Sequence, residues 1–240
     1  KAASEGRLQV LKGMGEKKEE NILRGIRLFK ESQQRISIGK ALPLVKEIIN
    51  SLKKKTGVKE IEPAGSLRRM KETIGDIDIL ASGSNGKEII SGFVSLPIVK
   101  DVLASGETKG SIIVEGNIQV DLRVVEKDSF GAALQYFTGS KLHNIHLREM
   151  AKRLGLKISE YGIFRGDKKI GGEIEENIYS AIGLDWIPPE LREDRGEIEA
   201  AGKKSLPNLV RVEDIKGDFH VHSNWSDGAE SVEEIVEMAR

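Results

Sequence analysis

The sequence contains no cysteine, which excludes disulfide bonds and zinc sites built from thiolates. It also lacks any apolar run approaching the roughly 20 residues that cross a bilayer, and its polar N-terminal stretch has no signal-peptide core. These absences predict a cytoplasmic protein without a membrane partner. Apolar residues make up 38% of the 240 residues, which is enough for a core in one or two domains.

The sequence also lacks a net charge: its formal charge at pH 7 is zero, although the positive and negative residues are unevenly distributed. Residues 1–60 carry 15 Lys+Arg against 7 Asp+Glu, a difference of +8, whereas residues 185–240 carry 7 against 14, a difference of −7. A basic first quarter indicates contact with nucleic acid at that end of the chain. Ordinary solvated helix faces explain the same charges equally well.

Helical and strand-like segments alternate along the chain. Apolar residues at helical spacing predict a helix over residues 38–55, with Pro43 tolerated in its first turn. Further helices are expected over residues 87–94, 129–138, 141–154 and 175–182. Strands are expected within residues 58–65, 75–81, 98–105, 110–116 and 118–125, followed by a small β-turn-β over residues 156–172. The turn at residues 115–117 should join two antiparallel strands.

Three aspartates fall on the polar faces of two of these strands. Asp76 and Asp78 alternate with isoleucines in "GDIDIL", so both carboxylates point to one side, and Asp121 lies on the polar face of "IQVDLRVV". Neighbouring like charges are costly unless a cation lies between them, and carboxylate oxygens suit Mg²⁺ or Mn²⁺. Two such ions can drive phosphoryl transfer. Solvated acids on half-exposed strands are the alternative.

A candidate phosphate-binding turn precedes these aspartates. Gly65 and Ser66 follow the strand "KEIEP", where backbone N–H groups and a hydroxyl could receive phosphate oxygens. Arg68 and Arg69 add cations beside this turn, and a guanidinium can bind a phosphate through two hydrogen bonds.

Taken in order, these motifs resemble a known family. "AGSLRR…GDIDIL…VDLRVV" resembles the nucleotidyltransferase palm, and "ALQYFTGSKLHNIHLREMAKRLGLKISEYGIF" resembles the family X DNA polymerases, over residues 35–189 in all. "GDFHVHSNWSDG" resembles the first metal motif of a polymerase-and-histidinol-phosphatase (PHP) domain. The resemblance implies an α+β fold, in which a mixed sheet with flanking helices forms the palm.

The resemblance also implies an order of domains along the chain, and it implies that the chain is a fragment of a longer protein. The expected parts are partial fingers with a helix-hairpin-helix, the palm, an α/β thumb, a linker, and the first strand and helix of a PHP domain. Their expected bounds are residues 1–35, 36–140, 141–189, 190–216 and 217–240. The N-terminal lyase domain and the rest of the PHP domain are expected to be missing.

Within the resemblance, the three aspartates take metal-binding and catalytic roles. Asp76 and Asp78 are expected to bind two Mg²⁺ or Mn²⁺ ions. Asp121 is expected to bind the catalytic ion and to take part in activating the primer 3′-hydroxyl group. Arg123, on the same face as Asp121, is expected to contact DNA and to pair with Asp78 in the open site.

Other matched residues are expected to bind nucleotide or DNA. The expected nucleotide-binding residues are Gly65, Ser66, Arg69, Gly75, Tyr136, Phe137, Gly139, Lys141 and Asn144. Asn144 and Arg148 lie four residues apart and therefore share a helix face, which in the family reads the minor groove. Without the motif, Tyr136 and Phe137 would be core aromatics at a helix end.

The two ends of the chain carry weaker resemblances. "LKGMGEKKEENI" resembles a helix-hairpin-helix, in which Lys12, Gly13, Gly15 and Lys17 would contact DNA phosphates; a helix connection with a glycine C-cap fits almost as well.

At the other end, His220 and His222 alternate on an expected strand and Asp227 follows, a partial set of ligands for Zn²⁺ or Mn²⁺ in the complete PHP domain. Because later ligands are missing, no 3′–5′ exonuclease activity is expected.

The sequence therefore predicts a monomeric, template-directed DNA polymerase core. It would add deoxynucleotides to a primer 3′-hydroxyl on a primer-template or gapped duplex, as in short-gap repair. A template-independent nucleotidyltransferase acting on an RNA end or a small molecule is the main alternative, and a DNA-binding module with a silent palm is another.

Overall fold

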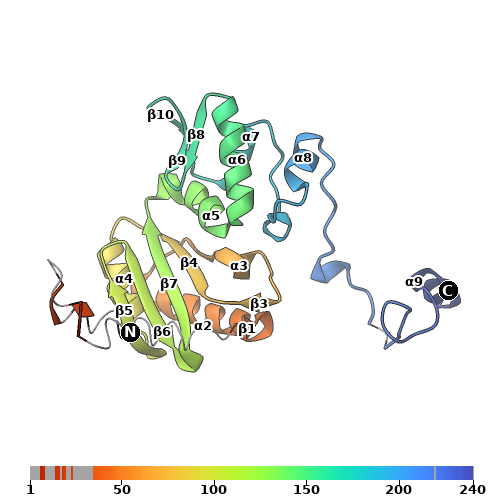
Figure 1. Cartoon of the computed structure of the whole chain (residues 1–240), viewed down its shortest axis with the longest axis horizontal. Coiled ribbons are helices and arrows are strands. Elements are labelled where there is room, and N and C mark those ends of the chain that lie inside the picture. The colour runs from red at the N-terminus through yellow and green to blue at the C-terminus, as the bar shows by residue number, and fades with distance from the viewer. Residues whose placement is uncertain are drawn as a thin grey trace. The chain divides into compact units, whose positions relative to one another are not determined.

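The chain folds into two separate units, Lys1–Leu206 and Pro207–Arg240, which are described one at a time (Figure 1). The computed structural model describes residues 6–8, 14–16, 18–19, 23, 35–218 and 220–239. Among these residues, no helix combines the length and the apolar character needed to span a membrane. The expected helix-hairpin-helix falls mostly outside the described residues: Lys12, Gly13 and Lys17 are not described, and Gly15 is exposed.

A five-stranded mixed sheet forms the centre of the first unit. Its order is β2-β4-β7-β6-β5, in which β4 and β7 are parallel and all other neighbours are antiparallel. The strands are β2 (Ile61–Pro63), β4 (Ile77–Ser82), β5 (Val99–Ser105), β6 (Lys109–Val114) and β7 (Ile118–Val125). The predicted hairpin is present, with Glu115–Asn117 as a short 3-10 turn between β6 and β7. The expected mixed sheet is confirmed.

Helices α2 (Ile38–Thr56) and α4 (Gly86–Val94) cover one face of this sheet. Four residues at helical spacing bury one side of α2: Ala41, Val45, Ile48 and Leu52. The helix ends at Gly57, whose φ of 70° suits a glycine C-cap, and its last turn carries three lysines that complement the helix dipole. Because these helices pack on the face that holds Ile77, Ile79, Val120 and Leu122, the acidic residues between them face the other way.

The opposite face of the sheet is only partly covered. Leu80, on the same face as Asp78, packs against Ala133 and Leu134 of α5 (Phe130–Thr138). Near the start of β4, the chain also forms α3 (Gly65–Arg68), and β1 (Ile36–Ser37) pairs with β3 (Thr73–Ile74). The covering by α5 stops short of Asp78, which leaves room for a pocket there.

A second apolar core joins the remaining elements of the first unit. It combines α5, α6 (Lys141–Arg153) and α7 (Glu175–Ser180) with an antiparallel sheet in the order β10-β9-β8. These strands are β8 (Leu156–Ser159), β9 (Gly162–Arg165) and β10 (Lys168–Gly171), one more than the predicted β-turn-β contains. Gly131 allows α5 to approach α7 closely, because a Cβ at this position would collide with the backbone of Ile174.

The expected linker over residues 190–216 is wrong in its first half. Residues 189–206 belong to the first unit: Pro189–Leu191 form a 3-10 helix, and α8 (Glu197–Gly202) packs into the second core. Ile187 and Ile198 are buried there, at 0% and 2% exposure. A six-residue helix is too short to show a sustained apolar period, so the charges and prolines around it dominate the sequence pattern.

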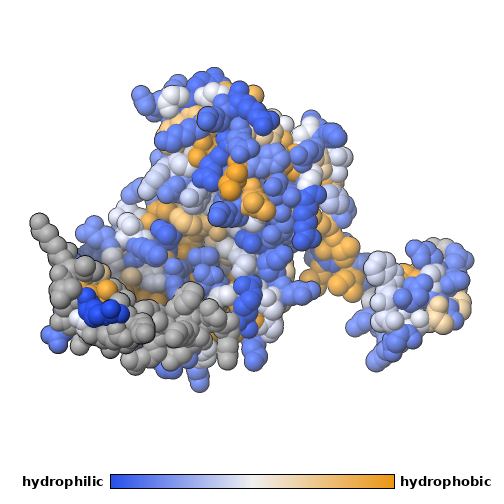
Figure 2. All heavy atoms as spheres, viewed as in Figure 1, coloured by the Kyte–Doolittle hydropathy of each residue, from blue (hydrophilic) through white to orange (hydrophobic). Residues whose placement is uncertain are grey.

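The second unit holds little regular structure among its described residues. It contains a 3-10 helix at Val212–Asp214 and α9 (Val232–Met238), whose first turn is capped by Ser231. The strand expected at His220–His222 does not form, since none of the unit's described residues forms a strand that could pair with it. Figure 2 shows apolar side chains at the start of this unit, where Val210 and Val212 are 80% and 85% exposed.

The packing of α8 leads to a stability prediction. Ile198→Ala should lower the free energy of unfolding by about 2–5 kcal/mol, because it removes a fully enclosed side chain from the second core. Leu142→Ala, at a position that is 58% exposed on α6, should change it by less than about 0.5 kcal/mol. Urea denaturation followed by circular dichroism compares the two; equal, small effects would mean that α8 is not part of the core.

Candidate nucleotide and metal site

An open pocket of about 550 Å³ lies between the sheet and the elements of the second core. Its walls come from distant parts of the sequence, namely Arg35, Gly65, Ser66, Arg69, Lys71, Asp76, Asp78, Tyr136, Phe137, Thr138, Gly139, Ser140, Lys141, Asn144 and Arg148. Of the residues predicted to bind nucleotide, only Gly75 is outside this wall. The structure thus brings together residues whose grouping in the sequence rested on motifs alone.

Two of the predicted metal-binding aspartates are direct neighbours on parallel strands. Asp78 of β4 is in register with Asp121 of β7, and Asp76 lies immediately before β4. Burial, together with the charges of Asp76 and Asp121, raises the pKa of Asp78 to about 6. Partly buried carboxylates held against one another in this way form a donor set suited to a hard divalent cation.

Asp121 is engaged by other groups in this structure. Its Oδ1 accepts hydrogen bonds from Ser111 Oγ and from Gln119 Nε2, the latter at 2.9 Å, and its Oδ2 lies 3.4 Å from Lys109 Nζ. Among the described residues, no three His, Asp or Glu side chains are gathered closely enough to hold one ion. The donor chemistry fits a divalent cation, whereas ligation by all three aspartates stays a prediction.

The residues around Asp121 were not predicted from the sequence. Gln119 could have been found, because strand alternation places it on the face of Asp121. Ser111 and Lys109 lie on β6, and only the register that pairs Ser111 with Asp121 reveals them. Lys109 supplies a positive charge beside Asp121, in addition to the one that the sequence predicted from Arg123.

Gly65 brings the backbone of α3 against the carboxylate of Asp78. Its φ is +59°, and a Cβ at this position would collide with Asp78 Oδ2. The Ala64 N–H also donates to the backbone carbonyl of Asp78, at 2.8 Å. Only glycine therefore permits the predicted phosphate-binding turn to lie beside the predicted metal ligand.

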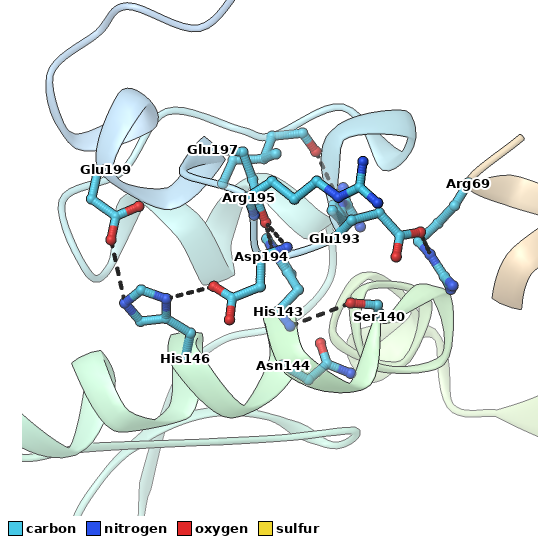
Figure 3. Close-up of polar contacts among 12 residues, drawn as sticks. Arg69, Ser140, His143, Asn144, His146, Glu193, Asp194, Arg195, Glu197 and Glu199 are labelled. Atoms are coloured by element: carbon cyan, nitrogen blue, oxygen red, sulfur yellow. Dashed lines mark hydrogen bonds and ion pairs between the residues drawn. The ribbon is translucent and has the colours of Figure 1, made fainter. Parts of the chain in front are cut away.

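Arg69, the predicted phosphate-binding cation, is paired with the chain's own carboxylate (Figure 3). Its Nε donates to Glu193 Oε1 at 2.8 Å, and its Nη1 donates to the Thr138 carbonyl at 2.5 Å. Lys71 Nζ lies 3.5 Å from the same Glu193 oxygen. Burial alone would raise the pKa of Glu193, but the hydrogen bond from Arg69 and the two positive charges lower it.

Arg68 points away from the pocket into a buried ion-pair network. It donates to both carboxylate oxygens of Glu175, each at 2.7 Å, and to Thr138 Oγ1 at 2.8 Å. Arg192, which is 0% exposed, donates to Glu175 Oε1 at 2.7 Å and to the Ile187 carbonyl at 2.8 Å. Burial opposes ionisation of Glu175, but hydrogen bonds and charges of the two arginines outweigh it and lower its pKa to about 2.

The predicted base-reading and sugar-binding residues hold one another in place. The rings of Tyr136 and Phe137 meet edge to face at 5.2 Å between centroids. Asn144 Nδ2 donates to the Tyr136 carbonyl at 2.7 Å, and its Oδ1 accepts from Gln135 at 2.7 Å. Arg148, exposed on the next turn of α6, donates to the Asn144 carbonyl at 3.1 Å.

Three further expected site residues lie as follows. The guanidinium of Arg123 lies 4.6 Å from the centroid of the Phe137 ring. The structure records no ion pair of Arg123 with Asp78, though its positive charge lowers the pKa of Asp78 somewhat. Lys141 is exposed at the start of α6. Gly75 lies beside Arg35, whose Nη1 would be 3.2 Å from an added Cβ.

His220, His222 and Asp227 contact one another within the second unit. The two imidazole Nε2 atoms are 3.1 Å apart, and His222 Nδ1 lies 2.6 Å from Asp227 Oδ1. All three side chains are exposed. They are near one another although no strand holds them, and their metal-binding role stays a prediction.

Two likenesses to known proteins bear on the family of the chain. Residues 133–193 match the family model described as DNA polymerase beta thumb. The DNA polymerase/3′-5′ exonuclease PolX of Bacillus subtilis is 40% identical to the chain across 98% of the chain. Together they support the assignment of the chain to the family X DNA polymerases. The family inferred from the sequence motifs is thereby confirmed.

Other family X relatives differ in how much of them the chain covers. DNA polymerase lambda of Rattus norvegicus is 26% identical over 54% of the chain and 28% of its own length. Repair DNA polymerase X of African swine fever virus is 26% identical over 56% of the chain and 82% of its own length. The chain spans 42% of PolX, less than half of that protein.

The raised pKa of Asp78 leads to a prediction about stability without divalent cations. Because the ionised carboxylate is disfavoured in the folded state, Asp78→Asn should raise the free energy of unfolding at pH 7.5 by on the order of 1–3 kcal/mol. The gain should shrink as the pH falls from about 6 towards 3.8, where the folded wild-type carboxyl is protonated. Thermal unfolding in EDTA measures it, with the exposed Asp167→Asn as control; a lower melting temperature would contradict the repulsion.

The lowered pKa of Glu175 predicts that removing its charge lowers the free energy of unfolding, the opposite of the effect expected for Asp78→Asn. Glu175→Gln should destabilise the protein at pH 7 by about 3–5 kcal/mol, because it leaves Arg68 and Arg192 without their shared counter-ion. The difference from wild type should be full above pH 4.5 and decline as the pH falls towards 2. Urea denaturation between pH 7 and 3 tests this. The exposed neighbour Glu176 provides the control Glu176→Gln; a difference independent of pH would contradict the ion pair.

Proposed function

We propose that the chain is the core of a template-directed DNA polymerase that fills short gaps in duplex DNA. The observation that carries the proposal is the pocket in which Asp76 and Asp78 meet the glycine-serine turn, Arg69 and the Tyr136–Gly139 segment. A nucleoside triphosphate needs carboxylates for its divalent cations, donors for its phosphates and a wall for its sugar, and this pocket offers all three.

The proposed mechanism assigns the metal to the aspartates. Asp76, Asp78 and Asp121 would hold two Mg²⁺ or Mn²⁺ ions, in keeping with the divalent-metal dependence of family X polymerases. Such ions activate the attacking 3′-hydroxyl group and stabilise the leaving oxygen of phosphoryl transfer. Asp121 must then exchange its partners Ser111, Gln119 and Lys109 for the cation and the primer terminus.

The chain's other residues would bind and orient the substrates. Ser66 and the backbone at Gly65 and Gly75 would donate hydrogen bonds to the β- and γ-phosphates, with Arg69 adding charge. Tyr136, Phe137 and Gly139 would border the sugar, and Lys141, exposed beside the pocket, would add a cation for the nucleotide.

The DNA would lie along the exposed side of α6 and the basic N-terminal region. Asn144 is held by Tyr136 and Gln135, so its position is fixed before substrate arrives. Arg148 and Arg123 would contact the duplex, and Lys12, Gly13, Gly15 and Lys17 would contact DNA phosphates at the N-terminal end. Fixed polar side chains at a helix surface suit inspection of the minor groove, which favours templated synthesis over untemplated transfer.

A single-nucleotide gap assay tests the proposal. Wild-type protein with Mg²⁺ should extend the primer by one complementary deoxynucleotide, and Asp121→Ala should reduce the rate by more than about 100-fold because a metal-binding carboxylate is lost. DNA binding, measured by fluorescence anisotropy, should be retained. Glu115→Gln, an exposed acid in the β6–β7 turn, is the matched control.

Two other outcomes would replace the proposal. Extension of single-stranded RNA, with no preference for the templated base, would support a template-independent transferase. Binding of the gapped duplex without incorporation by wild-type protein would support a DNA-binding module with a silent active site.

A further inference from the structure

Glu193 lies where two cations of the pocket wall converge. Its Oε1 is 2.8 Å from Arg69 Nε and 3.5 Å from Lys71 Nζ. Figure 3 shows the Glu193 side chain directed at Arg69. Arg69 and Lys71 both line the pocket, so one carboxylate partly neutralises both pocket cations. This is the arrangement of an anion-binding site filled by the protein itself.

The contact is partly shielded from water and held by a fixed backbone. Arg69 and Glu193 are only 14% and 23% exposed, so solvent screens their attraction less than at an open surface. The residue before Glu193, Arg192, is fully buried, and its carbonyl accepts a hydrogen bond from the Ser140 N–H at 2.9 Å. Glu193 therefore reaches Arg69 from an anchored position.

A carboxylate and a phosphate oxygen compete for the same donors of an arginine. Guanidinium groups bind both through parallel N–H bonds, and here Nε is engaged by Glu193 and Nη1 by the Thr138 carbonyl. A phosphate approaching Arg69 along its Nε edge would meet the negative charge of Glu193 at contact distance. Both anions cannot hold this edge at once without strong repulsion.

We propose that Glu193 stands in for a nucleotide phosphate in the unliganded protein and is displaced from Arg69 when a triphosphate binds. The inference rests on the proposed function, in which Arg69 receives a phosphate. Glu193 thereby weakens the binding of every ligand whose phosphate must take its place on Arg69, because each such ligand has to break the same ion pair.

The test compares the binding of two anions to the full chain without DNA. Isothermal titration calorimetry with Mg²⁺-dATP, and separately with sodium tripolyphosphate, should give about tenfold tighter binding to Glu193→Gln and to Glu193→Ala than to wild type. Deoxyadenosine, which has no phosphate, should show the same affinity in all proteins.

Glu190→Gln is the matched control, because it removes the same charge from an exposed residue three positions away. It should leave both affinities within about twofold of wild type, since an exposed charge beyond contact distance is screened by salt. Melting temperatures of the variants identify any that fail to fold, and the second Glu193 variant covers that case.

Weaker or unchanged binding of both anions to the Glu193 variants would overturn the inference. Weaker binding would mean that Glu193 orients Arg69 for its ligand, and unchanged binding would mean that it is a bystander. The tripolyphosphate result separates this failure from failure of the proposed function. Tighter tripolyphosphate binding without nucleotide incorporation keeps the inference and rejects the polymerase. Incorporation with unchanged affinities does the reverse.

Discussion

The carboxylate of Glu175 holds the walls of the pocket together. It is the shared counter-ion of Arg68 in α3 and of Arg192 in the segment before α8, two residues 124 positions apart in the sequence. Neither guanidinium could be enclosed alone, because an unpaired buried charge is strongly unfavourable. Since α3 begins at Gly65 and is followed directly by Arg69, the same ion pairs fix the predicted phosphate-binding turn against the second core. These ion pairs therefore tie the α3 side of the pocket to the side formed by the second core.

A second property of the pocket is that it balances its own charges. Next to the pocket wall, Lys109 lies beside Asp121, the neighbour of Asp78, and Glu193 lies beside the wall residues Arg69 and Lys71. Without these partners, the site would carry unpaired charges of both signs near apolar walls. The internal partners lower that cost, and under the proposed function substrate and metal would take their places. Asp78 is the exception: burial, together with the charges of Asp76 and Asp121, raises its pKa to about 6.

Much of the fold followed from local sequence patterns. The helix expected over residues 38–55 is α2 to within one residue, because its apolar spacing is long and regular. The alternation around Asp78 and Asp121 correctly put both carboxylates on the face away from the main core. Patterns of this kind show which side of an element is buried. Combined with the order of the family motifs, they grouped most of the pocket residues.

What could not be predicted depends on contacts between distant segments. The Arg69–Glu193 pair joins residues 124 positions apart, and the role of Ser111 depends on strand register, so neither leaves a local pattern. Helix α8 was missed because its burial comes from Ile198 and Ala201 fitting a core made elsewhere. The expected strand at His220 failed for the converse reason: alternation was present, but no partner strand exists among the unit's described residues.

The burial of α8 also fixes where the first unit of this polypeptide can be cut. A chain truncated after about residue 189, where the family resemblance ends, would lack Ile198 and Ala201. The residues of the second core that pack against them would then be exposed to solvent. The truncation would remove Arg192 as well, and so leave Glu175 with a single arginine. The natural place to trim is the junction between Leu206 and Pro207, where the two units meet in the chain.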